Sequence, residues 1–146
     1  MIRVQAEDFD PGAELDRLAA VDGAGGLTSF VGIVRGGDVS AMTLEHYPGM
    51  TERQMAAVEA EARSRWPVLE VTLIHRYGRL VPGDRIVFVG VAASHRAAAF
   101  SACEFLIDWL KTKAPFWKLE ERPEGDRWVE AVTTDDDRAQ RWEKAS

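Results

Sequence analysis

Several short stretches of the chain alternate apolar with polar residues or carry runs of β-branched and aromatic residues, and both patterns are typical of β-strands. Turn-forming segments such as Gly36-Gly37-Asp38 and Pro123-Glu124-Gly125-Asp126 separate these stretches. The pattern predicts strands at 2–5, 27–35, 41–47, 71–77, 85–92, 116–121 and 127–132, with hairpins joining 27–35 to 41–47, 71–77 to 85–92, and 116–121 to 127–132.

Other segments have the start signals or the three- and four-residue apolar spacing of helices. Pro11 begins the first, where a missing N–H costs little. Thr51, followed three residues later by Gln54, is expected to cap the second, and Ser94 to cap the third. The predicted helices span 11–20, 51–66 and 94–113.

The mixture of hairpins and helices predicts the α+β class, with antiparallel hairpins and two main helices in one domain spanning 1–146. A chain of 146 residues can bury a sufficient core without a metal or a disulfide. The charged residues after about residue 132 are expected to form a frayed, peripheral tail.

Composition excludes several classes of protein. The longest apolar run, Ile86 to Ala93, is too short to span a bilayer, and the N-terminus lacks the apolar region of a signal peptide. One cysteine cannot form an internal disulfide framework or a cysteine-based zinc site. We therefore expect a cytoplasmic protein without membrane contact.

The chain carries 18 basic and 24 acidic residues, a net charge of −6, which argues against nucleic-acid binding through a basic face. Nine acidic and only five basic residues lie in 120–146. The rest of the chain is close to neutral, so a local basic pocket is compatible with the composition.

Lysine is rare in this chain, and most of its lysines lie close together. There are 14 arginines but only four lysines, and Lys111, Lys113 and Lys118 lie within eight residues. A lysine can change its protonation state and act as an acid, a base or a nucleophile, which an arginine cannot do. The cluster fits a reactive site, and it fits a solvated helix end equally well.

Three more cations stand where an anion could be bound. His95 and Arg96 lie in the first turn of a predicted helix, where the backbone N–H groups favour anions, and Arg35 ends a predicted strand. Ordinary solvent exposure explains each of them when it is considered alone. If they converge with Lys111 and Lys118, the pocket suits an anionic small molecule or a C-terminal carboxylate, either in an enzyme or in a binding module.

Other common chemistries lack support. His46, His75 and His95 are far apart and show no metal-ligand spacing, so no metal is expected. The chain has no G-x-x-x-x-G-K-[ST] loop, and the glycines of 22–26 lead into a predicted strand and not a helix, so no cofactor is expected either. Cys103 falls on the apolar stripe of a predicted helix and is interpreted as a core residue.

Four segments resemble the molybdopterin synthase catalytic (large) subunit family. The resemblance covers roughly 26–131, in order and with similar spacing. The most specific segment runs from Leu110 to Lys118. The four segments are Thr43-Leu44-Glu45-His46-Tyr47-Pro48-Gly49-Met50-Thr51, Pro82-Gly83-Asp84 with the strand that follows it, Ser94-His95-Arg96, and Leu110-Lys111-Thr112-Lys113-Ala114-Pro115-Phe116-Trp117-Lys118 with Pro123-Glu124-Gly125-Asp126-Arg127-Trp128-Val129.

The resemblance implies a hammerhead-like fold and a sulfurtransferase. It implies conversion of cyclic pyranopterin monophosphate to molybdopterin, with no metal needed at this step. Sulfur would arrive as a Gly-Gly thiocarboxylate at the C-terminus of a small ubiquitin-like subunit. A homodimer of large subunits, with a small subunit at each end, would form a heterotetramer.

The resemblance also assigns roles to residues of this sequence. Lys111 and Lys118 match the family's functional lysines, and we expect both to be catalytic. Two alternatives stay open: a non-catalytic module that binds a ubiquitin-like Gly-Gly tail, and an enzyme acting on nucleotides or phosphorylated sugars. The expected substrate-binding residues are Ile33, Val34, Arg35, His95, Arg96, Lys111, Lys118, Leu119 and Glu120.

Overall fold

The computed structural model describes residues 1–129 together with residues 140, 142 and 143. These residues form three helices and eight strands in two four-stranded sheets, and the predicted α+β class is confirmed. No helix among them is long and apolar enough to cross a membrane. The elements are β1 (Ile2–Gln5), α1 (Pro11–Ala19), β2 (Gly26–Ile33), β3 (Ala41–His46), α2 (Met50–Arg65), β4 (Val68–Arg76), β5 (Gly78–Leu80), β6 (Arg85–Ala93), α3 (Arg96–Thr112), β7 (Phe116–Glu121) and β8 (Arg127–Val129).

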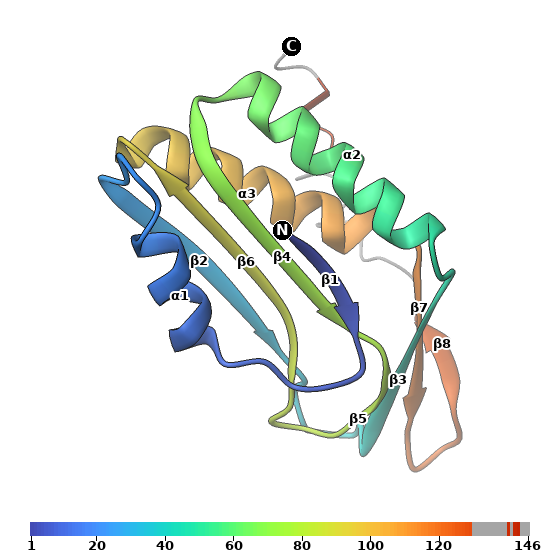
Figure 1. Ribbon diagram of the computed structural model, residues 1–146. Coiled ribbons are helices and arrows are strands. Elements are labelled where there is room, and N and C mark those ends of the chain that lie inside the picture. The colour runs from blue at the N-terminus through green and yellow to red at the C-terminus, as the bar shows by residue number, and fades with distance from the viewer. Residues whose placement is uncertain (130–139, 141, 144–146) are drawn as a thin grey trace.

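The first sheet has the strand order β1-β4-β6-β2 and is covered on both faces (Figure 1). β4 and β6 form the predicted antiparallel pair, while β1 is parallel to β4. Alternate residues of β4 and β6 face opposite layers, so Leu73 and Val89 pack toward α2 and α3, whereas Ile74 and Phe88 pack toward α1. Burial on both faces explains why these two strands are almost continuously apolar.

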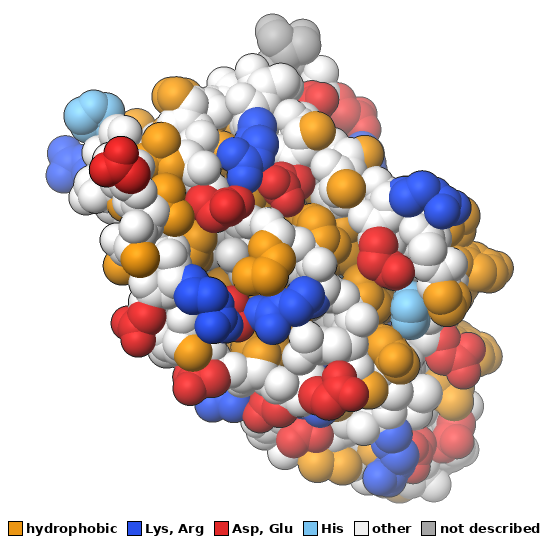
Figure 2. All heavy atoms as spheres, in the orientation of Figure 1, with side chains coloured by type: hydrophobic (Ala, Val, Ile, Leu, Met, Phe, Trp, Pro, Cys, Tyr) orange, Lys and Arg blue, Asp and Glu red, His pale blue; other side chains and the backbone are white. Residues whose placement is uncertain are grey.

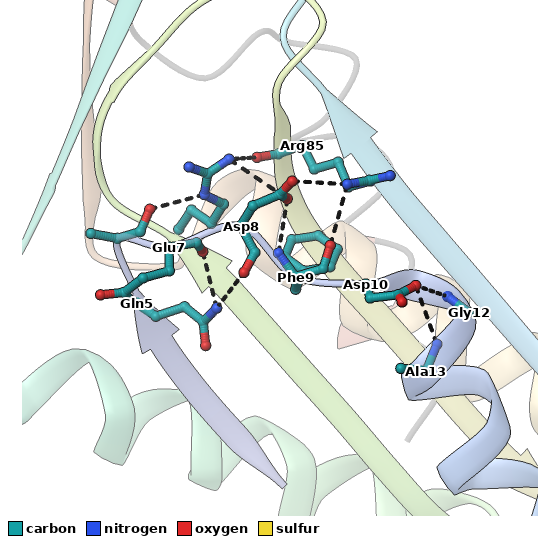
Figure 3. A network of polar contacts seen from close by, with 10 residues as sticks. Gln5, Glu7, Asp8, Phe9, Asp10, Gly12, Ala13 and Arg85 are labelled. Carbon is teal, nitrogen blue, oxygen red and sulfur yellow. Dashed lines mark hydrogen bonds and ion pairs between the residues drawn. The ribbon is translucent and has the colours of Figure 1, made fainter.

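Glycine at position 90 allows α1 to approach the sheet closely. A Cβ added at Gly90 would lie 2.6 Å from a methyl carbon of Leu18 and 2.6 Å from the ring of Phe88. The helix is tied down before it begins, because Asp8 receives a 2.9 Å bond from Arg85 and Asp10 caps the first turn (Figure 3). The chain leaving β1 is thereby fixed against β6.

The second sheet corrects one predicted hairpin. Its order is β5-β3-β7-β8, so β3 pairs with β5 and β7, whereas β2 pairs with β6 in the first sheet. The predicted hairpin between 27–35 and 41–47 is therefore wrong. Backbone bonds from Val34 N–H to Asp84 and from Gly83 N–H to Val34 hold the end of β2 against the segment before β6. The expected β7–β8 hairpin is confirmed as far as Val129; residues 130–132 lie outside the described residues.

Two predicted helix caps are each displaced along the chain. The N-cap of α2 is Gly49, with φ at 83°, and the Glu52 carboxylate accepts its N–H, so Thr51 and Gln54 are not the capping pair. Thr51 is instead buried, and its hydroxyl accepts a bond from the Tyr47 N–H. The N-cap of α3 is His95 rather than Ser94. N-cap propensity favours the hydroxyl residues Thr51 and Ser94. At α2, however, Gly49 adopts a positive φ, and the helix begins directly after it.

The expectation of a peripheral tail falls mostly outside the described residues, but Trp142 is described and lies against α2 and α3. Its ring makes edge contacts with Trp66 and Phe105, with centroids 5.5 and 5.6 Å away. Its indole N–H donates to Asp108 at 2.7 Å, and its carbonyl accepts from Arg65 at 2.8 Å. Trp142 thus contributes to the packing of the domain.

Replacing Trp142 by Ala is expected to lower the free energy of unfolding by about 2 kcal/mol, because two aromatic contacts and the bond to buried Asp108 are lost. Urea denaturation followed by circular dichroism measures this change. Trp128, which is 56% exposed, supplies the control, since Trp128→Ala should change stability little. Equal effects of both substitutions would contradict the packing role of Trp142.

Candidate active site

The C-terminal end of α3 and the start of β7 bring two lysines to one cavity. Lys111 lies in the last turn of α3, and the chain reverses at Ala114 and Pro115 before Lys118 enters β7 opposite Leu44. Both lysine side chains line a small cavity of about 60 Å³ between the first sheet, α3 and β7. Two lysines that lie close together in the sequence therefore also line one cavity, and their catalytic role stays a prediction.

The remaining wall of this cavity, which we call the lysine cavity, is mostly apolar. Apart from the two lysines, only His75 among the described lining residues has a polar side chain. Lys118 is half-buried and Lys111 is exposed, and apolar walls beside such ammonium groups strengthen their attraction for an anionic ligand. The other lining residues are Phe30, Gly32, Ile33, Ile86, Val87, Val89, Ile107 and Leu110.

His75 is a site residue that the sequence analysis set aside. It ends the buried face of β4 and is only 6% exposed. Burial lowers its pKa to about 4, and the positive charges of Lys118 and Lys111 act in the same direction. One signal was available in the sequence: His75 follows Val71 and Leu73 at two-residue spacing, so strand alternation placed a polar residue on an apolar face.

The end of β2 forms the rim of the lysine cavity. Ile33 lines it and is 54% exposed, whereas Val34 is buried with Leu44 and Leu80 between the two sheets. Arg35 follows at the surface. The contact of these three residues with substrate stays a prediction, and of the three it is Ile33 whose side chain lines the cavity.

His95 and Arg96 lie far from the two lysines within one chain. Both are exposed at the N-terminal end of α3, and the rise of 1.5 Å per residue separates Arg96 from Lys111 by about 22 Å along the helix. The five cations therefore do not converge within a single chain. The helix that carries both groups is straight and rigid on this scale, so it holds them apart.

Leu119 and Glu120 follow Lys118 in β7 on opposite faces of the strand. Glu120 shares the face of Lys118 and forms an ion pair with Arg122 at 2.5 Å. Leu119 pairs with Trp128, and both lie on the other face. Binding of substrate by either residue stays a prediction.

The cysteine prediction is confirmed. Cys103 is buried in the core, and burial raises the pKa of its thiol to about 11, which leaves it unreactive near neutral pH. In the part of the chain that the structure describes, no group of three His, Cys, Asp or Glu side chains is arranged to hold a metal ion.

A larger hollow of about 410 Å³ lies between α2, α3 and Trp142. Its charged lining residues include Glu61, Arg65 and Lys113, and Lys113 is paired with Glu143. Acidic and basic groups there neutralise one another, whereas the charged groups among the described residues that line the lysine cavity are all basic. We therefore take the smaller cavity as the candidate active site. Charges of both signs are also mixed over the face seen in Figure 2.

Comparison with known proteins gives one consistent family. The family model described as MoaE protein matches residues 4–113. The molybdopterin synthase catalytic subunit of Pseudomonas aeruginosa is 55% identical over 98% of this chain and 99% of its own length. The molybdopterin biosynthesis MoaE protein from Burkholderia ambifaria has a TM-score of 0.85 at 53% identity, covering 98% of this chain and 97% of that one. A complex of subunits 1 and 2 of molybdopterin-converting factor from Helicobacter pylori has the same fold, with a TM-score of 0.74 at 19% identity over 90% of each chain.

The lowered pKa of His75 gives a testable dependence of stability on pH. The unfolded chain takes up a proton at this histidine near pH 6.5, but the folded protein does so only near pH 4. The unfolded state therefore binds more protons between these values, so stability falls as the pH drops from 6.5 to 4, by roughly 3 kcal/mol from this group. Urea titrations of the protein and of His75→Phe across this range measure the difference.

The variant should show a flatter dependence of stability on pH, because its side chain does not titrate. His95→Gln, which changes an exposed histidine, is the matched control and should retain the slope of the unmodified protein. An unchanged slope in His75→Phe would contradict the burial of a neutral imidazole.

Proposed function

The chain belongs to the MoaE protein family, and on that premise we propose that it transfers sulfur from the C-terminal thiocarboxylate of a small ubiquitin-like subunit to cyclic pyranopterin monophosphate. It is an enzyme subunit whose function is that of the molybdopterin synthase catalytic subunits. The name of that 55% identical relative specifies a subunit, which supports a second polypeptide as the partner.

The observation that carries the proposal is the pair of lysines in one apolar cavity. A thiocarboxylate is an anion, so two ammonium groups attract it, and a narrow cavity admits an extended Gly-Gly tail more readily than a bulky one. Apolar walls exclude water and strengthen each charge interaction with the bound tail. A basic cavity of this kind supports binding of a partner's tail over the alternative that the lysines are only a solvated helix end.

The lysines suit the chemistry of sulfur release. Once sulfur has bonded to the pterin side chain, the bond between sulfur and the acyl carbon of the partner must break. Water adds to the acyl carbon, the carbonyl oxygen becomes an oxyanion, and sulfur leaves with the bonding electron pair while a carboxylate stays on the partner. The Lys111 ammonium stabilises the oxyanion or donates a proton, and Lys118 orients the tail. Two partner molecules supply the two sulfurs of the dithiolene.

The phosphate of the substrate requires further cations, and Arg35, His95 and Arg96 are the proposed ones. Within one chain, Arg96 lies far from Lys111. We therefore assign the phosphate-binding cations and the lysines to a site that two copies of the chain share. β2 is an edge strand of the first sheet, and it runs beside α3 from Gly26, near Arg96, to Ile33 at the lysine cavity. A two-fold axis across the middle of β2 would exchange these two ends.

The exposed side chains along this edge support such a dimer. Phe100 on α3 is 64% exposed and Ile33 on β2 is 54% exposed, an apolar surface that a second copy would cover. In that arrangement His95 and Arg96 of one copy reach the lysine cavity of the other. The small subunit would then bind once per cavity, giving the heterotetramer.

The reaction is tested by mixing the protein with cyclic pyranopterin monophosphate and a thiocarboxylated small subunit, and following molybdopterin by mass spectrometry. Lys111→Ala and Lys118→Ala are each expected to lower turnover by roughly 10²-fold or more, because an acid or an oxyanion-stabilising charge is lost. Lys113→Ala is the matched control, since Lys113 is exposed and paired with Glu143.

Near-native turnover of Lys111→Ala with saturating partner would contradict its proposed role. A stable complex that yields no product in the unmodified protein would favour a non-catalytic module that binds the Gly-Gly tail. Binding of phosphorylated ligands without any need for a sulfur donor would favour the nucleotide or sugar enzyme.

A shared site is tested by mixing two inactive variants. Lys111→Ala has an intact Arg96, and Arg96→Ala has an intact Lys111, so a mixed dimer contains one complete site. Random exchange of subunits at equal amounts should restore about a quarter of the unmodified activity. No recovery, with exchange confirmed by native mass spectrometry of the mixed dimer, would place each complete site within one chain.

A further inference from the structure

Asp108 is a buried carboxylate on the side of α3 that faces away from the first sheet. It is 5% exposed. Two residues separate it from the core residue Leu106, and at 3.6 residues per turn this places the two side chains on roughly opposite sides of the helix. A charged group in that position is normally solvated. Here the indole ring of Trp142 lies against it.

Trp142 fixes the direction of this carboxylate. Its Nε1–H donates to Asp108 Oδ2 at 2.7 Å, and a hydrogen bond to an ionised acceptor is one of the stronger kinds. The ring is itself held by edge contacts with Trp66 and Phe105, and the Trp142 carbonyl accepts a bond from Arg65. A rigid donor from the C-terminal part of the chain therefore holds a side chain of α3.

Lys111 stands one turn after Asp108 on the same helix. Residues three apart are neighbours on a helix surface, and an acidic and a basic side chain at this spacing commonly form an ion pair. Among the residues that the structure describes, Lys111 takes part in no ion pair, and its side chain lines the lysine cavity. The carboxylate and the ammonium group are thus kept apart although their spacing favours pairing.

We propose that Trp142 is a positioning residue of the sulfur-transfer site: its indole N–H holds the Asp108 carboxylate in place and so keeps this carboxylate from drawing the Lys111 ammonium group out of the lysine cavity. This inference rests on the proposed function, in which Lys111 acts on the bound tail. Trp142 acts through Asp108 and does not touch the reacting atoms.

The second polar contact between the C-terminal residues and α3 does not have this role. Lys113 and Glu143 are paired at 3.0 Å, but their side chains are 50% and 60% exposed. An ion pair so open to water contributes little. The contact that involves a buried carboxylate is therefore the one expected to influence Lys111, and Lys113→Ala stays suitable as a control for turnover.

A single substitution removes the donor and keeps an aromatic ring. Trp142→Phe can still contact Trp66 and Phe105, but it has no N–H for Asp108. The carboxylate then turns toward Lys111, and we expect kcat of sulfur transfer at saturating small subunit to fall about threefold. Trp128→Phe is the matched control, because it removes the indole N–H of an exposed tryptophan and should leave kcat unchanged.

A rescue experiment separates this role from packing. Asp108→Asn keeps the shape of the side chain and removes its charge, so the double variant Trp142→Phe/Asp108→Asn should have nearly the kcat of Asp108→Asn alone. A near-native kcat in Trp142→Phe, or a double variant no more active than Trp142→Phe, would overturn the proposal, because removing a charge does not repair packing. Circular dichroism checks that each variant is folded. Asp108→Ser also removes the charge and replaces Asp108→Asn if that variant does not fold.

Chemical labelling gives a readout that does not depend on turnover. Lys111 is exposed, so its amine is accessible to acetic anhydride. A lysine paired with a carboxylate gives up its proton less readily and is acetylated more slowly. Peptide mass spectrometry should therefore show Lys111 acetylated about threefold more slowly in Trp142→Phe, relative to Nα-acetyl-lysine added to the same solution, and at the original rate in the double variant.

An unchanged rate of Lys111 acetylation in Trp142→Phe would overturn the proposal. So would a reduced rate that persists in the double variant, because the charge of Asp108 would then not be its cause. If the unmodified protein makes no molybdopterin, the proposed function fails, whereas the labelling still decides whether Trp142 controls the surroundings of Lys111.

Discussion

Burial of β4 and β6 on both faces is the constraint from which the rest of the structure follows. β6 is buried from Val87 to Ala93, with α1 on one side and α2 and α3 on the other. Apolar strands of this kind cannot be exposed without losing much of the hydrophobic stabilisation of a domain of this size. The helices are therefore held against the sheet. The position of α3 in turn determines where Arg96, at its N-terminal end, and Lys111, at its C-terminal end, lie.

The site follows from the C-terminal end of that helix. The reversal at Ala114 and Pro115 sends the chain into the second sheet, so that exposed Lys111 and half-buried Lys118 line one narrow cavity. The gap is closed by apolar side chains of the first sheet, and His75 is the neutral polar group among them. Among the described lining residues, ammonium groups beside apolar walls suit a small anionic ligand.

Local patterns predicted the elements well, because strands and helices depend on neighbouring residues. The strands at 2–5 and 116–121 were predicted with their observed bounds, and α2 and α3 were located to within a few residues. Pairing was less accessible, since β2 and β3 are joined by a short connection that resembles a hairpin yet lie in different sheets. The residues around Gly36 and Gly37 do not indicate that Val34 forms backbone hydrogen bonds with the distant segment before β6.

The sequence by itself determined the mixed class, the buried strands, the inert cysteine and the clustering of lysines that drew attention to Lys111 and Lys118. Motif resemblance added the family, which the comparisons bear out. Only the tertiary structure separated His95 and Arg96 from the lysines and brought His75 to them, because a rigid helix holds its ends apart whereas a sheet joins residues that are distant along the chain. The number of residues between two positions gives the distance between the ends of a helix. It does not show which distant strands a sheet brings together.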